Sequence, residues 1–148
     1  MAAIEIGREA PDFTLPDENN QPVHLKDLRG SPVVLVFYRA DFSPVCKDEM
    51  CGYRDDYSQF QAKGARVFGI SRDSFYAHKA FKESLGLTHS LLADPTGKVA
   101  RLYDTWDEDK AVANRLMVVI DKDGIIRHLT RNEPLKHSVP GDALAALG

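Results

Sequence analysis

The sequence has little of what marks membrane proteins, nucleic-acid-binding proteins and secreted disulfide-rich proteins. It contains two cysteines, one tryptophan and no apolar run that approaches a membrane span. The net charge is −3, and basic and acidic residues are mixed along the chain. The sequence therefore has no basic stripe, and we do not expect nucleic acid or an anionic membrane as a partner. The residues after Met1 lack the apolar core of a signal peptide, so we expect a cytosolic protein.

The sequence also lacks the ligand spacing of a metal site. Cys46 and Cys51 form one C-x4-C pair, with no second close pair and no H-x3-5-H partner. The histidines are scattered, and we interpret each of them as an ordinary surface or core residue: His24, His78, His89, His128 and His137. No repeat, low-complexity segment or linker interrupts the 148 residues, so we predict one domain over residues 1–148 without a metal.

What is present is an alternation of strand and helix patterns. The continuous apolar run Val33–Tyr38 predicts a strand buried on both faces, at the centre of a sheet with helices on both sides. Further strands are expected at 66–71, 91–93 and 116–120, and hairpins at 10–25 and 116–129. Helices are expected from Ser43 to Lys63, from Asp73 or Ser74 to Leu85, from Asp94-Pro95 to Tyr103 and over 142–147, and a loop over 106–114. The fold class is α/β, with a central mixed sheet flanked by helices.

The stretch after the central strand is the most informative. Ser43 is a good N-cap, and Pro44 suits the first helical position. Cys46 then falls in the first turn, where free N–H groups and the helix dipole favour a thiolate, the nucleophilic form. The path from strand end through loop to helix start is where open α/β sheets place their sites. One stripe of the predicted helix is expected to face the sheet: Cys46, Met50, Tyr53, Tyr57 and Phe60.

The two cysteines are not equivalent on this helix. Residues five apart lie roughly 8 to 9 Å from Cα to Cα, because the helix rises about 1.5 Å per residue. A disulfide rarely spans more than about 7 Å, so Cys46 and Cys51 can bond only after the first turns unwind. Gly52 lowers the cost of that unwinding, since glycine is a poor helix former.

A set of motifs in this order resembles the peroxiredoxin family, and within it the bacterioferritin-comigratory-protein or PrxQ branch of the AhpC/TSA superfamily. The resemblance covers about residues 7–147 and implies a thioredoxin fold with an N-terminal β-hairpin extension. It also implies a peroxidase without a metal or prosthetic group. The residues that carry it are Gly7, Ala10–Leu15, Phe37-Tyr38, Asp41–Cys46, Glu49, Cys51, and Arg115 before the strand that ends in Ile120–Gly124.

The resemblance implies a role for each residue of the motif. Cys46 matches the cysteine that attacks hydrogen peroxide or small organic hydroperoxides and becomes a sulfenic acid. Ser43 and Arg115 match residues that hold the thiolate and the peroxide, and Glu49 matches the glutamate that orients the arginine. Cys51 matches the resolving cysteine, whose disulfide thioredoxin or a similar dithiol protein reduces. Members of this branch are often monomeric, and a monomer is expected here.

One position departs from the family motif and leaves alternatives open. Arg39 stands where the motif has a proline that shields the cysteine and fixes the loop. Arg39 either stabilises the Cys46 thiolate and partly substitutes for the proline, or marks a slower peroxidase or a thiol-switched redox sensor. By position alone, Glu49 is also compatible with a plain first-turn acid, and Cys51 with an incidental cysteine. A thioredoxin-like disulfide reductase is disfavoured because that chemistry uses C-x-x-C.

Overall fold

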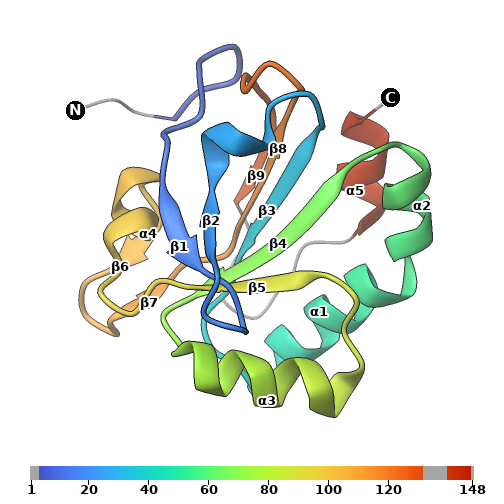
Figure 1. Ribbon diagram of the computed structural model, residues 1–148. Coiled ribbons are helices and arrows are strands. Elements are labelled where there is room, and N and C mark those ends of the chain that lie inside the picture. The colour runs from blue at the N-terminus through green and yellow to red at the C-terminus, as the bar shows by residue number, and fades with distance from the viewer. Residues whose placement is uncertain (1–3, 132–139, 148) are drawn as a thin grey trace.

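The computed structural model describes residues 4–131 and 140–147, which form a mixed α/β fold (Figure 1). The elements follow one another in this order: β1 (Thr14–Pro16), β2 (Pro22–His24), the short 3-10 helix η1 (Leu25–Leu28), β3 (Val33–Phe37), α1 (Pro44–Asp55), α2 (Tyr57–Ala62), β4 (Arg66–Ser71), α3 (Phe75–Leu85), β5 (Ser90–Ala93), α4 (Lys98–Leu102), β6 (Trp106–Asp107), β7 (Val112–Ala113), β8 (Leu116–Ile120), β9 (Ile126–Arg131) and α5 (Pro140–Ala146).

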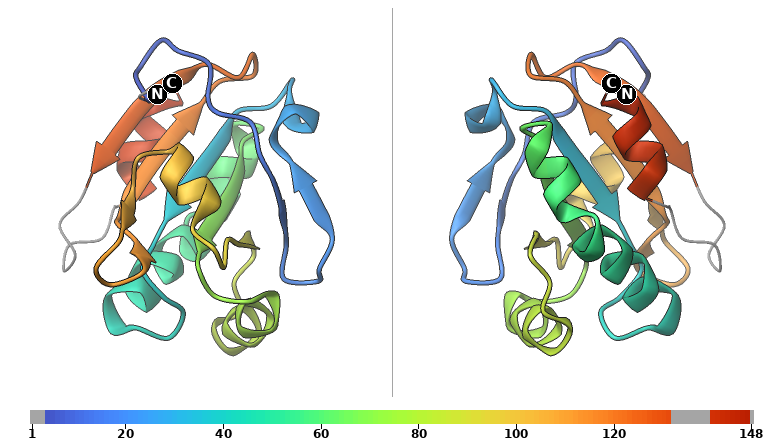
Figure 2. Two further views of the ribbon diagram at one scale, coloured as in Figure 1. Left: turned by 90° about the vertical axis from the view of Figure 1, so that its left-hand side faces the viewer. Right: turned by 90° about the vertical axis from the view of Figure 1, so that its right-hand side faces the viewer.

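The central sheet is mixed and has β3 in its middle. Its strand order is β5-β4-β3-β8-β9, with β3, β4 and β5 parallel to one another and β8 antiparallel to both β3 and β9. All five residues of β3 are buried, as the apolar run predicted. The predicted N-terminal hairpin is also present, with β1 antiparallel to β2 in a separate two-stranded sheet. This hairpin and α5 lie at opposite sides of the molecule (Figure 2).

The sheet separates two hydrophobic clusters, because successive residues of a strand point to opposite faces. Val33, Leu35 and Phe37 pack on the face that the N-terminal segment and α4 cover. Val34 and Val36 pack on the other face, with α1, α2, α3 and α5 (Figure 1). Gly69 of β4 lets α1 approach closely, since a Cβ there would lie 3.1 Å from the Met50 sulfur. Helices therefore cover both faces, as predicted, and α1 packs directly over the sheet centre.

The helix predicted from Asp94-Pro95 begins later than expected. Pro95 and Thr96 form a turn, and α4 starts at Lys98. Asp94 still stabilises the helix start from outside, because its carboxylate accepts from the N–H groups of Val99 at 3.2 Å and Ala100 at 2.9 Å. The Asp94-Pro95 pattern correctly predicted that Asp94 accepts from N–H groups of the helix, but a turn separates Asp94 from the first helical residue.

Three further predictions of element boundaries were wrong in detail. The segment 106–114, predicted as a loop, contains the short antiparallel pair β6–β7. The helix predicted up to Lys63 is divided at Asp56 into α1 and α2, and aspartate favours caps and turns over helix interiors. The last helix starts at Pro140, two residues before the predicted Asp142.

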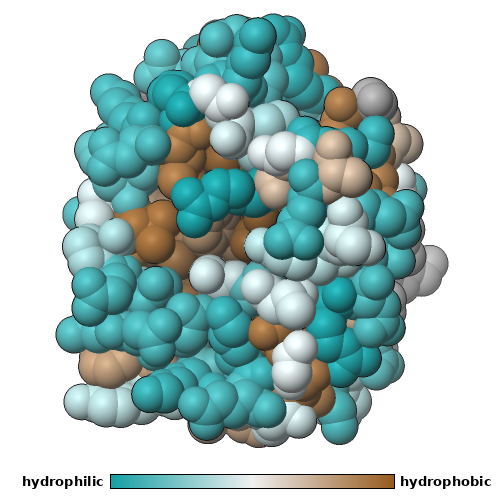
Figure 3. All heavy atoms as spheres, turned by 45° about the vertical axis from the view of Figure 1, so that its right-hand side comes forward, coloured by the Kyte–Doolittle hydropathy of each residue, from teal (hydrophilic) through white to brown (hydrophobic). Residues whose placement is uncertain are grey.

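The surface turned forward in Figure 3 is mostly hydrophilic, with separate small hydrophobic areas. Large apolar side chains that stay exposed in the described residues include Phe42 and Tyr76. Among the residues that the structure describes, no helix is long and apolar enough to cross a membrane.

Candidate functional site

The first turn of α1 carries Cys46 where the sequence predicted it. Pro44 is at the start of the helix, and the Ser43 side chain caps it by accepting from the Cys46 N–H at 3.4 Å. Cys46 is fully buried and belongs to the cluster between α1 and the sheet. The positive end of the helix dipole therefore lies at a buried thiol.

Arg115 links Cys46 to Glu49. One guanidinium nitrogen, Nη2, lies 3.1 Å from the Cys46 Sγ, and the other, Nη1, donates to Glu49 Oε1 at 3.1 Å. Both charged side chains are buried. The register explains how Arg115 reaches a cysteine 69 positions earlier: Leu116 of β8 pairs with Phe37 of β3, so Arg115 lies beside the loop that leads to α1.

This arrangement has a clear electrostatic consequence. A guanidinium that donates to sulfur stabilises the thiolate more than the thiol, and the buried setting strengthens the interaction. The Glu49 carboxylate fixes the plane of the guanidinium, because two nitrogens of one rigid group are engaged at the same time. The structure thus brings together four of the five predicted site residues: Ser43, Cys46, Glu49 and Arg115.

A surface pocket of about 380 Å³ lies at the start of α1, lined in part by Ser43, Pro44 and Val45. Arg115 lines it and contacts the sulfur, so the pocket leads toward the buried thiol. Its lining includes three cationic side chains and no acidic one: the full set is Arg39, Ala40, Ser43, Pro44, Val45, Lys110, Val112 and Arg115. Lys110 and Val112 were missed from the sequence, since they belong to the segment predicted as an irregular loop.

Arg39 contacts neighbours other than Cys46 in this pocket. Its Nη1 donates to Asn114 Oδ1 at 3.3 Å, and its Nη2 lies 4.0 Å from the Asp107 carboxylate. The guanidinium that contacts the sulfur is that of Arg115. Arg39 therefore bridges the loop after β3 to the segment that contains β6 and β7.

Cys51 lies in the same helix but in a different setting. It is half-buried, while Cys46 is fully buried, and both thiols are free. Because α1 is continuous over Pro44–Asp55, the two cysteines keep the helical separation of roughly 8 to 9 Å. The folded helix holds them too far apart for a disulfide.

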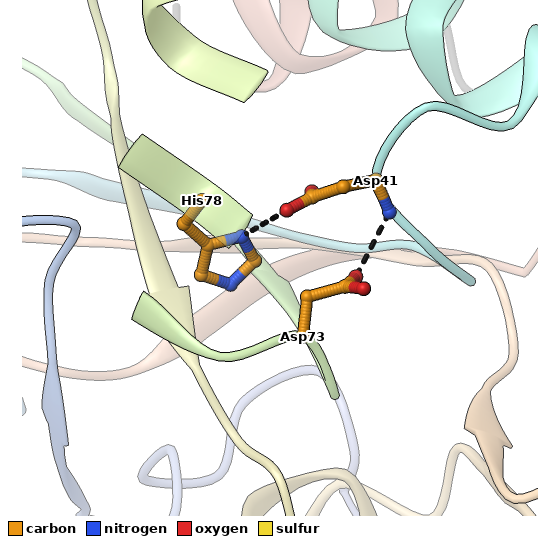
Figure 4. Close-up of side chains that lie close together, drawn as sticks. All are labelled: Asp41, Asp73 and His78. Atoms are coloured by element: carbon orange, nitrogen blue, oxygen red, sulfur yellow. Dashed lines mark hydrogen bonds and ion pairs between the residues drawn. The ribbon is translucent and has the colours of Figure 1, made fainter. Parts of the chain in front are cut away.

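A second polar cluster, largely buried, lies at the loop between β3 and α1, and no local sequence pattern predicted it. Asp41, Asp73 and His78 place one ligand atom each within 4.8 Å of one another, which is the spacing of a possible metal site. Hydrogen bonds already use these atoms: His78 Nδ1 lies 2.7 Å from Asp41 Oδ2, and Asp73 Oδ2 accepts from the Asp41 N–H at 2.8 Å (Figure 4). We therefore interpret the cluster as a set of hydrogen bonds that hold the loop between β3 and α1 in place.

The other histidines divide into surface and core. His24 and His128 are partly exposed, and His137 lies outside the described residues. His89 is a core residue whose Nε2 lies 3.4 Å from the Met50 sulfur. Burial and the nearby charge of Lys82 lower the pKa of His89 to about 3, so its ring is neutral at ordinary pH. His78 is a core residue, as predicted, and its ring also hydrogen-bonds to Asp41.

Comparisons with known proteins agree on the family. Residues 6–129 match the AhpC/TSA family. The chain is 42% identical over 140 residues to the chloroplastic peroxiredoxin Q of Arabidopsis thaliana, covering 93% of this chain and 65% of that protein. It is 38% identical to the putative peroxiredoxin bcp of Coxiella burnetii, covering 84% of this chain and 86% of that protein. The crystal structure of peroxidoxin BcpB from Mycobacterium tuberculosis superimposes with a TM-score of 0.87 at 31% identity, covering 97% and 96% of the two chains.

The fold of this solved neighbour confirms the predicted fold class. The chain spans about two thirds of the length of the plant relative. On the family match, the relatives and the structural neighbour together, the chain belongs to the AhpC/TSA family of peroxiredoxins.

Proposed function

We propose that the chain is a thiol peroxidase that reduces hydrogen peroxide and small organic hydroperoxides. The observation that carries the proposal is the Arg115 guanidinium, which contacts the Cys46 sulfur and the Glu49 carboxylate at 3.1 Å each. A thiolate held beside a fixed cation at a helix start is an activated nucleophile. The relatives named peroxiredoxin Q and bcp support the same activity.

The proposed chemistry begins with attack of the Cys46 thiolate on the terminal oxygen of the peroxide. The S–O bond forms as the O–O bond breaks, the leaving alkoxide or hydroxide takes a proton, and Cys46 becomes a sulfenic acid. Arg115 stabilises the charge that moves from sulfur to the leaving oxygen, and the Ser43 hydroxyl is the neighbouring polar group of the pocket.

Cys51 then resolves the sulfenic acid. Its thiolate attacks the Cys46 sulfur, the S–O bond breaks as the disulfide forms, and the departing hydroxide takes a proton from solvent to become water. This step requires that the first turns of α1 unwind, because the helix holds the cysteines apart. A dithiol protein such as thioredoxin then reduces the disulfide by exchange and returns both thiols.

The test mixes the reduced protein with one equivalent of hydrogen peroxide in a rapid-mixing instrument and maps the product by peptide mass. The proposal predicts fast peroxide loss that needs Cys46 and ends in a Cys46–Cys51 disulfide. Cys51→Ser is expected to keep the first step and stop at the sulfenic acid, while Cys46→Ser loses both steps. If wild-type protein consumes peroxide no faster than Cys46→Ser, the proposal is wrong.

A second assay, with excess peroxide and a dithiol reductant, separates the enzyme from the thiol-switched sensor that Arg39 left open. A peroxidase turns over many times with a dithiol reductant. A sensor forms the disulfide quickly but turns over slowly, and the unwound α1 alters a partner surface. We further propose a monomer, to be tested by light scattering of the reduced and oxidised forms. Location in the cytosol stays a prediction from the sequence.

A further inference from the structure

The loop between β3 and α1 is tied down at Asp41. The Asp41 backbone N–H donates to Asp73 Oδ2 at 2.8 Å, and its carboxylate accepts from the Tyr38 hydroxyl and lies 2.7 Å from His78 Nδ1 (Figure 4). Asp41, Tyr38 and His78 are all buried. One residue thus connects the loop to the end of β3, to the segment after β4 and to α3.

His78 contacts Asp41 and the neighbouring strand through its two ring nitrogens. Its Nδ1 lies 2.7 Å from Asp41 Oδ2, and its Nε2 lies 2.9 Å from the backbone oxygen of Leu92 in β5. The ring is fully buried, so these contacts are shielded from water. His78 therefore connects Asp41 to α3 and to the edge strand β5.

Tyr38 completes the tie at Asp41. Burial and the charge of Asp41 raise the pKa of Tyr38 well above its usual range, so its hydroxyl stays protonated and donates. The Asp41 carboxylate is therefore contacted by the side chains of Tyr38 and His78, and it is not left unsatisfied in the core.

Phe42, the residue after Asp41, has a backbone conformation that depends on these contacts of Asp41. Phe42 has φ of 66°, in the left-handed region that residues other than glycine seldom adopt. Its ring is more than half exposed and contacts Phe81 of α3 edge-on, with 5.0 Å between ring centroids. A strained residue keeps its conformation only where its surroundings fix the chain on both sides. Here Asp41 is the fixed point before Phe42, and the Ser43 cap of α1 is the fixed point after it.

We propose that Asp41, held by His78 and Tyr38, is a positioning residue that fixes the loop so that Cys46 meets both Arg115 and the incoming peroxide. This inference rests on the proposed peroxidase function, because positioning is measured through the reaction with peroxide. When the tie is lost, Phe42 relaxes, the start of α1 moves, and the sulfur becomes more accessible but worse placed.

The test compares His78→Gln with His24→Gln, both in a Cys51→Ser background so that only Cys46 reacts. His24 is a matched control because its Nε2 also lies 2.7 Å from a carboxylate, that of Asp12, in the distant N-terminal hairpin. Two rate constants are measured at one pH, for hydrogen peroxide and for iodoacetamide. The first depends on placement beside Arg115, whereas the second mainly reports exposure of the thiolate.

We expect His78→Gln to react about 10-fold more slowly with peroxide, since small misplacements of reacting groups are costly. Its reaction with iodoacetamide is expected to become faster, and His24→Gln is expected to change neither rate. A purely structural role would lower the unfolding temperature and leave both rates as they are below that temperature. Unchanged rates in folded His78→Gln, or a proportional fall in both, would overturn the proposal.

Tyr38→Phe provides a second variant if His78→Gln does not fold. It removes only the hydroxyl that donates to Asp41, and the same opposite shift in the two rates is expected with smaller size. The Cys51→Ser parent protein distinguishes failure of the proposed peroxidase function from failure of the proposed role of Asp41. If the parent does not react with peroxide, the proposed function is wrong, whereas a reactive parent with unaffected variants contradicts only the role of Asp41.

Discussion

The start and the middle of helix α1 differ in how firmly they hold their cysteines. At the start, Cys46 is fully buried, Arg115 contacts its sulfur, and the loop before it is tied down at Asp41. Toward the middle, Cys51 is half-buried and is followed by Gly52, a poor helix former. The firm setting of Cys46 suits the reaction with peroxide, which needs exact placement of the sulfur. The half-buried setting of Cys51 suits the later step, in which the first turns of α1 must unwind before the two cysteines can bond.

The largest expected effect comes from removing the guanidinium at the firmly held end. Arg115→Ala is expected to slow the reaction with peroxide by about 1,000-fold, because the fixed charge beside the reacting sulfur is lost. Breaking its buried ion pair with Glu49 is also expected to cost about 3 to 5 kcal/mol of unfolding free energy. Arg115→Lys keeps the positive charge but has a single nitrogen, which cannot contact Cys46 and Glu49 as the planar guanidinium does. It is expected to recover part of the rate of reaction with peroxide. Single-turnover rapid mixing and urea unfolding measure the two effects.

Arg127→Ala is the control for Arg115→Ala, since Arg127 also pairs with a carboxylate, that of Asp121, but is half exposed. We expect almost no change in rate or stability. If Arg127→Ala and Arg115→Ala behave alike, the firmly held end has no special role.

The second effect concerns His89, which contacts Met50 beneath the middle of α1. The pKa of its ring is lowered from 6.5 to about 3 by burial and by Lys82, so the unfolded chain takes up the proton first as pH falls. Stability is therefore complete above about pH 6.5 and declines below it, by about 2.5 kcal/mol between pH 6 and pH 4. We expect urea unfolding of His89→Leu to show a pH dependence that is smaller by this amount. His128→Gln, with a partly exposed ring, is the control, and an equal pH dependence in wild type and His89→Leu would refute the assignment.

The third effect is at Gly52. Gly52→Ala is expected to stabilise α1 by about 1 kcal/mol and to slow formation of the Cys46–Cys51 disulfide about fivefold, without changing the first reaction with peroxide. The new Cβ fits, because the Pro140 Cγ and Cδ atoms would lie 3.4 and 3.5 Å away in ordinary contact. Gly141→Ala in α5, where a Cβ meets nothing within 4 Å, is the matched helical control. A disulfide rate that Gly52→Ala leaves unchanged would argue against unwinding as the slow step.

The smallest effect is expected at Arg39. Its contacts with Asn114 and Asp107 are those of a partly exposed loop bridge, so Arg39→Ala is expected to lower the peroxide rate less than about fivefold. Asn114→Ala, which removes the partner, is expected to match it. A loss as large as that of Arg115→Ala would instead show that Arg39 acts on the thiolate directly.

The parts of the molecule that the sequence predicted correctly are those with local causes. Ser43 and Pro44 favour a helix start at this point, and the β-branched apolar run at Val33 is typical of a buried strand. The position of Arg115 came from the resemblance, and its physical basis appears only in the pairing of β8 with β3. The Asp41–His78 contact joins residues 37 positions apart through the packing of α3, and no local pattern encodes such a pairing.

The unwinding of α1 on disulfide formation is tested most directly by hydrogen exchange of α1 in the reduced and disulfide forms, followed by mass spectrometry. We predict that peptides covering Pro44–Asp55 exchange much faster in the disulfide form, while β3 and β8 keep their protection. A Cys46–Cys51 disulfide formed with α1 as protected as in the reduced protein would contradict the unwinding.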